Sequence, residues 1–265
     1  MIYLAGLIIS AGSNGTGTRR EPVEGEGTLG QQIVALVDRP GDAFAQIARR
    51  PGRGWFVPLL ILLVGTAVLQ IAAAPYEAAA AREAIDRQMA SLPPEQAGMV
   101  AAQAGRFATP LLVGAMGWLG SVLSAAVGVL LGAGILYFLS LVSGGEGEFG
   151  PTLGATLWAW TPFGLRPLVQ AAVVAAQRGL IVNQGLSYLV SVGDPLKDAR
   201  NVAYVLLSQV DLFSLWHLVL VYAASRALFR FGRNKAVLVT ALYAAINLLF
   251  RAGTVAIQAM LVPMS

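Results

Sequence analysis

Residues Gln209–Leu220, QVDLFSLWHLVL, place one carboxylate and one imidazole inside an apolar run, and this stretch decides the fold. The apolar run continues on both sides from Val202 to Ala224, which is long enough to cross a bilayer. An ionisable group at the middle of a membrane helix costs about 2.5–3.5 kcal/mol on insertion scales. We therefore expect Asp211 to have a positively charged partner on another spanning segment.

The composition supports an integral membrane protein. Of the 265 residues, 56% are hydrophobic and only 12% are charged, which is about half the charged fraction of a typical soluble domain. The 30 glycines suit closely packed membrane helices. Because the chain has no cysteine, disulfides, thiolate zinc sites and cysteine nucleophiles are excluded.

The N-terminal residues 1–28 are predicted to be a disordered tail. Ser10–Gly30 is rich in Gly, Thr and Glu and cannot bury a core. Ile2–Ile9 is apolar but has less than half of the roughly 20 residues that a spanning helix needs, and no basic residue precedes it as in a secretory signal. We interpret it as a floppy start, which would fit an upstream start codon.

Residues 29–54 are predicted to form two short amphipathic helices, broken at Pro40-Gly41, with Asp42 as the N-cap of the second. Phe44 and Ile47 share one face of that helix. Such a segment, with basic residues at its end, is typical of helices that lie in the membrane interface on the cytoplasmic side. A solvated linker is the alternative. The basic residues are Arg49, Arg50 and Arg53.

Residues 55–262 are predicted to form one domain of five transmembrane helices, so the fold class is an all-α integral membrane protein. Two polar excursions separate the first span from the second and the third from the fourth. The predicted spans are Trp55–Ala74, Thr109–Val142, Thr152–Ala176, Val202–Ala224 and Ala236–Met260.

The second span is predicted to be the central packing helix. Its Gly128 and Gly132 have the GxxxG spacing that lets two helix backbones approach closely. Small residues serve contacts within one chain as well as between chains, so the motif does not by itself indicate dimerisation. Whether the protein forms a homo-oligomer is left open by the sequence.

The distribution of basic residues predicts the orientation. One cluster precedes the first span, and a second fills the short turn between the fourth and fifth spans. By the positive-inside rule both are cytoplasmic, which places the N-terminus inside and the C-terminus outside. We expect these residues to face lipids or a partner: Arg49, Arg50, Arg53, Arg226, Arg230, Arg233 and Lys235.

Three buried charges are predicted at one depth. Asp211, Arg251 and Arg166 each lie nine or ten residues from the outer end of their span. The simplest interpretation is an internal ion pair that fixes helix order and register, with Asp211 meeting Arg251 directly and Arg166 completing the cluster. The functional alternative is an ion, proton or anionic-lipid site, with the spare positive charge attracting a head group. His217, nearly two turns away, is expected to be a packed or interfacial residue and not a ligand.

No catalytic constellation is recognisable, and we expect a protein that is not an enzyme and needs no metal or cofactor. There is no His-Glu-x-x-His zinc helix and no Gly-x-Ser-x-Gly elbow, and the chain has a single histidine. Paired-aspartate proteolysis is excluded because Asp211 is the only intramembrane aspartate.

The order of these features resembles the Yip1-domain membrane proteins. The resemblance covers about residues 30–260: a lead-in from Arg39-Pro40 to Pro51, the polar excursion, the Gly-rich second span, the turn at Gly144-Gly145, and a motif before a basic turn that contains Asp211, Phe213 and Trp216. Eukaryotic relatives act at endoplasmic reticulum and Golgi membranes with Rab-type GTPases in vesicle traffic. The Ala/Gly/Arg-rich composition looks prokaryotic, for which the resemblance implies a five-span inner-membrane protein.

The leading functional hypothesis is therefore a non-enzymatic adaptor or membrane-organising factor in the inner (plasma) membrane. Its partners would be membrane lipids and a membrane protein, and not nucleic acid. The alternative is a transporter or channel component that uses the Arg166, Asp211 and Arg251 cluster, for which the prolines of the third span, Pro162 and Pro167, are the only hint.

Overall fold

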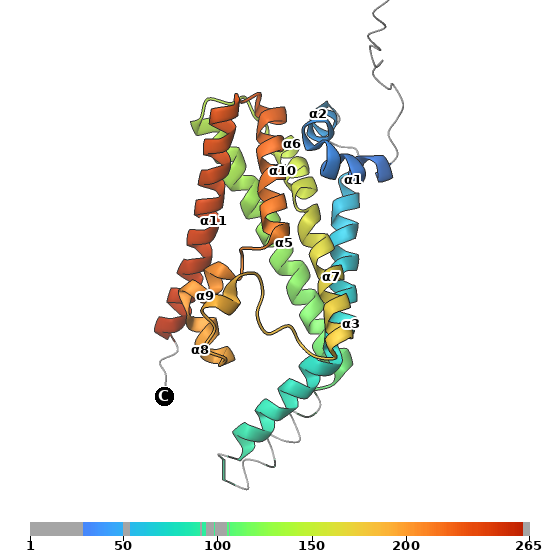
Figure 1. Ribbon diagram of the computed structural model, residues 1–265, viewed down its shortest axis with the longest axis vertical. Helices are drawn as coiled ribbons and strands as arrows, with labels where there is room; N and C mark the ends of the chain where they lie inside the picture. The colour runs from blue at the N-terminus through green and yellow to red at the C-terminus, as the bar shows by residue number, and fades with distance from the viewer. Residues whose placement is uncertain are drawn as a thin grey trace, which may run out of the picture.

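The computed structural model describes residues 29–49, 54–90, 92–93, 98, 105 and 107–261, and this part of the chain is helical, without strands (Figure 1). The predicted tail at residues 1–28, Arg50 and Arg53 lie outside the described residues. The helices are α1 Leu29–Asp38, α2 Pro40–Arg49, α3 Phe56–Met89, α5 Pro110–Val142, α6 Phe149–Ala159, α7 Thr161–Gln177, the 3-10 turn η1 Ser187–Leu189, α8 Pro195–Arg200, α9 Val202–Leu207, α10 Leu212–Phe229 and α11 Arg233–Leu261.

Four of the described helices are long and apolar enough to cross a membrane: α3, α5, α10 and α11. The sequence predicts five because it treats residues 152–176 as one span. In the structure this region is divided into α6, of 11 residues, and α7, of 17 residues. The division follows from Pro162, which has no N–H to continue the hydrogen-bond ladder of α6.

The helices form an elongated bundle (Figure 1). α3 packs against α7 and α5, and α10 packs against α11, α6 and α7. α6 and α7 follow one another along the bundle, while α1 and α2 lie at one end and the end of α11 lies at the other.

The N-terminal helices cover one end of the bundle. α2 buries Ala43, Phe44 and Ile47 and contacts α10 and α6. Leu36 of α1 joins the same core and is 1% exposed. The apolar face of α2 is thus packed on protein, and Arg49 lies exposed at the end of the helix.

The structure departs from the predicted fourth span, Val202–Ala224. The segment consists of the short helix α9 and the longer helix α10, separated by residues 208–211. Asp211 is the N-cap of α10 instead of a residue within a continuous helix. The turn is fixed by hydrogen bonds from the Leu186 and Val210 N–H groups to the Leu207 carbonyl. Gly185, at φ +55, lies so close to this turn that a Cβ would be 2.7 Å from the Val210 oxygen.

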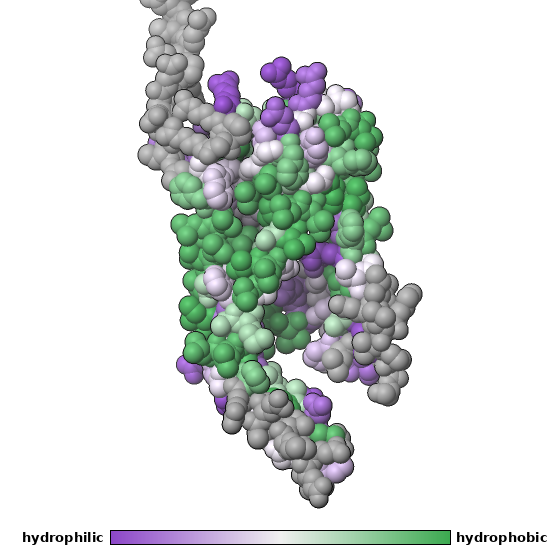
Figure 2. All heavy atoms as spheres, turned by 180° about the vertical axis from the view of Figure 1, so that it is seen from behind, coloured by the Kyte–Doolittle hydropathy of each residue, from purple (hydrophilic) through white to green (hydrophobic). Residues whose placement is uncertain are grey.

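Large apolar side chains face outward along the bundle. Ile71 on α3, Leu111 on α5 and Leu249 on α11 are 77%, 81% and 71% exposed. Figure 2 shows this hydrophobic surface over the middle of the molecule, with hydrophilic residues gathered at its upper end. Apolar surface of this extent suits contact with lipid chains, in agreement with a membrane protein.

Candidate functional site

Asp211 and Arg166 form an ion pair at the start of α10. The Arg166 Nε atom lies 3.1 Å from Asp211 Oδ2, and each side chain is 16% exposed. The other carboxylate oxygen, Oδ1, accepts a hydrogen bond from the Ser214 N–H at 2.8 Å. One aspartate therefore caps a helix and neutralises an arginine at the same time.

Close contact between α3 and α7 positions Arg166. Gly65 of α3 faces the Gly164 carbonyl so closely that a Cβ on Gly65 would collide with that oxygen, and a Cβ on Gly164 would lie 2.9 Å from the Leu62 nitrogen. Arg166 follows Gly164 by two residues. Gly65 is about 14 Å along α3 at 1.5 Å per residue, so the ion pair lies well inside the thickness of a bilayer of about 30 Å. The Arg166 Nη2 group also donates to Gln184 Oε1 at 3.0 Å.

Arg251 lies at the same level of the bundle but does not pair with Asp211. It is about 27 Å along α11 from Arg233, and Asp211 is a similar distance along α10 from Arg230, at 1.5 Å per residue. Among the described residues, no carboxylate lies within ion-pair distance of Arg251. Two arginines and one carboxylate leave the cluster with an excess positive charge.

His217 lies at the break between α6 and α7 and is not part of this charge cluster. Its Nδ1 atom lies 2.7 Å from the Ala159 carbonyl oxygen, and its Nε2 atom lies 3.2 Å from the Tyr243 hydroxyl. The Trp158 carbonyl, which loses its helical donor to Pro162, accepts from the Thr161 hydroxyl at 2.7 Å. The carbonyls freed by the break are therefore satisfied inside the bundle, as an apolar environment requires.

The glycines of the GxxxG pair lie against this break within the same chain. Gly128 faces the ring of Trp160, which a Cβ would overlap. A Cβ on Gly132 would lie 2.8 Å from the Tyr243 hydroxyl. Both glycines thus make room for aromatic side chains, Trp160 at the break and Tyr243 of α11.

The motif residues Phe213 and Trp216 are partly buried on α10, and Trp216 packs against the core. The motif therefore combines a cap, an ion pair and a packed aromatic residue in its first two turns.

A basic surface lies at the end of the bundle that carries α2. We call it the basic end and define it by Arg49, Arg226, Arg230, Arg233 and Lys235, all of which are exposed. The Lys235 ammonium donates to the Ser143 carbonyl at 2.8 Å and lies 5.2 Å from the centre of the Phe231 ring.

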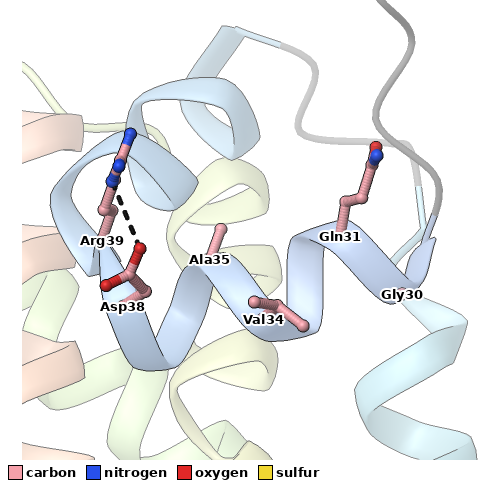
Figure 3. A pocket seen from close by; sticks show the side chains of 6 residues that line it. All are labelled: Gly30, Gln31, Val34, Ala35, Asp38 and Arg39. Atoms are coloured by element: carbon pink, nitrogen blue, oxygen red, sulfur yellow. Dashed lines mark ion pairs between the residues drawn. The ribbon is translucent and has the colours of Figure 1, made fainter.

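Other candidate sites in the described part of the chain have weaker support. No group of three or more His, Cys, Asp or Glu side chains lies together there as a metal site would need. A hollow of about 450 Å³ lies along α1, but five of its six lining residues belong to that one helix and the sixth, Arg39, follows it directly (Figure 3). The Asp38–Arg39 pair is exposed. It is a groove on the surface and not an enclosed pocket.

Comparison with known proteins identifies the family. The family model of the Yip1 domain matches residues 34–253, which is most of the chain and includes the charge cluster. The chain belongs to the Yip1 domain family. The resemblance noted from the sequence is thereby confirmed. Neither the curated proteins nor the solved structures searched gave a match to this Yip1 domain protein.

Sequence reasoning missed several residues that build the site. Asp211 followed by an apolar run and by Ser214 is a helix-start signal, and it would have placed Asp211 at a cap. Gly65 and Gly164 stand alone in apolar segments, so no spacing pattern marks them. Gln184 lies in a polar loop with no signal that it contacts Arg166.

Proposed function

We propose that this Yip1 domain protein is a non-enzymatic membrane-organising factor or adaptor whose basic end binds anionic lipids or a membrane-protein partner. The observation that supports the proposal is the basic end itself: five exposed cationic side chains from α2, α10 with its C-cap residue Arg230, and α11 lie on one end of an apolar bundle. Cationic residues beside a membrane are attracted to anionic head groups by about 1 kcal/mol each.

We further propose that α6 and α7 together act as a fifth span. Residues 149–177 would extend over about 40 Å at 1.5 Å per residue, which exceeds the hydrocarbon thickness of about 30 Å. The break is compatible with lipid surroundings because His217 and Thr161 satisfy its carbonyls. With five spans in an inner membrane, the positive-inside rule puts the N-terminus in the cytoplasm and the C-terminus outside.

The first two helices fit a position at the cytoplasmic interface. On α1, Val34 and Val37 are each 65% exposed. Insertion of these two valines among head groups would add to the attraction of the basic end.

Neutralisation of the basic end tests the functional proposal. The full-length variant R226Q/R230Q/R233Q should lose the preference for phosphatidylglycerol over phosphatidylcholine, measured by native mass spectrometry of lipids retained in micelles. A matched control, R87Q/R178Q/K197Q, removes three exposed cations from the opposite end and should keep that preference. Equal lipid retention by wild type and the first variant would count against the proposal.

Single cysteines test the proposed topology, since the chain has none of its own. Gly150, at the start of α6, and Ala199, in α8 beyond the end of α7, are exposed. In intact cells, a membrane-impermeant thiol reagent should label Ala199→Cys and spare Gly150→Cys. Labelling of both to the same degree would show that α6–α7 does not cross.

A transporter is the second candidate, and a specific observation favours it. Two helical segments, α6–α7 and α9–α10, are interrupted, and the second interruption lies at the Arg166–Asp211 pair. Interrupted helices with charged residues near mid-membrane are typical of transporter binding sites. Transport predicts a solute or ion flux in proteoliposomes that Asp211→Asn abolishes, whereas an adaptor predicts no flux.

A further inference from the structure

We propose that residues 179–193 form a re-entrant segment that lies in the outer leaflet of the bilayer and contacts its lipids, instead of a loop in the water outside. The inference rests on the proposed five-span topology, with the basic end at the cytoplasmic head groups. It assigns a lipid-facing surface to the part of the chain between α7 and α8.

The segment has the composition of a membrane-embedded chain. Residues 179–193 contain no charged side chain, although they belong to the second polar excursion between the predicted spans. Charged residues stand directly on both sides, Arg178 before the segment and Asp194 after it. An uncharged stretch of this length is too short to span the bilayer as a helix and is typical of a re-entrant or interfacial segment.

The segment turns back into the bundle. α7 ends at Gln177, about 16 Å beyond Arg166 at 1.5 Å per residue, yet Gln184 Oε1 accepts a hydrogen bond from Arg166 Nη2 at 3.0 Å. The backbone follows, since a Cβ on Gly185 would lie 2.7 Å from the Val210 oxygen, next to the start of α10. Figure 1 shows the chain leaving the end of α7 and returning toward the start of α10 before it reaches α8.

The start of α10 lies at membrane depth. Asp211 is about 22 Å along α10 from Arg226 of the basic end at 1.5 Å per residue, which is less than the hydrocarbon thickness of about 30 Å. The 3-10 turn η1, Ser187–Leu189, packs against α9, which precedes α10 and packs on α11. The returning segment therefore lies beside the outer part of the spanning helices.

Much of the backbone of the segment is satisfied inside the protein, as lipid surroundings require. The Tyr204 hydroxyl donates to the Val182 carbonyl at 3.0 Å. The Leu186 N–H donates to the Leu207 carbonyl at 3.0 Å, and the Leu189 N–H donates to the Leu186 carbonyl at 3.2 Å within η1. Because Tyr204 and Leu207 belong to α9, these bonds fix the segment to the fourth span.

The η1 turn is buried on one side and apolar on the other. Ser187 is 0% exposed, whereas Tyr188 and Leu189 are 59% and 61% exposed. Val182, earlier in the segment, is 69% exposed, and Leu212, which begins α10 beside it, is 75% exposed. The apolar surface of the segment thus continues onto a spanning helix, which favours lipid as its partner. An exposed tyrosine suits the boundary with the head groups, because its ring is apolar and its hydroxyl is polar.

Site-specific fluorescence in nanodiscs tests the inference on the full chain, which has no cysteine of its own. Val182→Cys, Tyr188→Cys and Leu189→Cys are each labelled with bimane. Quenching is then compared between aqueous iodide and phosphatidylcholine that carries a spin label close to its head group. We expect strong quenching by the spin label, as at Leu249→Cys on α11, and iodide quenching constants several-fold smaller than at Ala199→Cys on α8. All of these positions are exposed, so the cysteines leave the core packing intact.

Iodide quenching at Tyr188→Cys and Leu189→Cys as strong as at Ala199→Cys would place the segment in water and overturn the inference. Weak quenching by both agents would mean that protein, such as a second copy of this chain, covers the surface, and would overturn it as well. The proposed topology fails separately, through thiol labelling of Gly150→Cys and Ala199→Cys in intact cells. When that labelling is as expected, a water-exposed Tyr188→Cys refutes the re-entrant segment alone.

Discussion

Substitution of Asp211 should separate the two interactions that this side chain makes. Asparagine caps a helix as well as aspartate, so Asp211→Asn keeps the bond to Ser214 and removes only the ion pair with Arg166. Exposed ion pairs contribute about 0.2–1 kcal/mol, and removal of one partner from a buried pair costs about 3–5 kcal/mol. With both side chains 16% exposed, we expect a loss of about 3 kcal/mol. Asp211→Ala should cost about 1 kcal/mol more, because the cap is lost as well.

The assay is equilibrium unfolding in mixed micelles, with Glu146→Gln as the control. Glu146 is exposed on the turn between α5 and α6, and its neutralisation changes the net charge equally, with an expected effect below about 0.5 kcal/mol. Replacement of both ion-pair partners by leucine should recover much of the loss when the second position is Arg166, and not when it is Arg251. If Asp211→Asn matches Glu146→Gln, or if both double variants recover equally, the assignment of Arg166 as the partner is refuted.

Three further predictions follow from the packing. Gly65→Ala should destabilise the protein by about 1–3 kcal/mol, because the new Cβ meets a backbone carbonyl of α7 that cannot move aside. Gly120→Ala, whose new Cβ meets open space, should leave the stability nearly unchanged in the same unfolding assay. His217→Phe should lower the free energy of unfolding by about 1–3 kcal/mol, because it leaves the Ala159 carbonyl without a donor. A smaller loss of stability in His217→Gln than in His217→Phe would show that the hydrogen bond is responsible. The hydrogen bond that the Ser191 hydroxyl donates lowers the pKa of Asp198, so the Asp198 carboxylate stabilises α8 at pH values above its unfolded-state pKa, and this stabilisation is lost as the pH falls through the folded-state pKa. Hydrogen exchange in α8 should therefore accelerate on acidification in wild type but not in Asp198→Asn. Equal acceleration in both proteins would contradict this prediction.

The apolar segments could be predicted from the sequence, because their length and composition follow from the thickness of the bilayer alone. The sequence did not show which of these segments form continuous helices. Pro162 could have indicated the break in the third span, yet Thr152–Ala176 was predicted as one span. The break at residues 208–211 was overlooked as well, because Val202–Ala224 is apolar enough to be taken for one helix. The helix-start signal at Asp211 was present, and hydropathy outweighed it in our interpretation.

The sequence by itself determined that this is a helical membrane protein of the Yip1 domain family and that Asp211 needs a cation, since the cost of a buried charge is a local property. It offered two arginines at one depth, and the prediction that Asp211 meets Arg251 directly was wrong. The choice of Arg166 was made by tertiary structure, because the contact of Gly65 with Gly164 brings α7 close to α3 and Arg166 to the start of α10. That Arg251 is left without a carboxylate partner among the described residues likewise depends on how α11 packs, which no local pattern encodes.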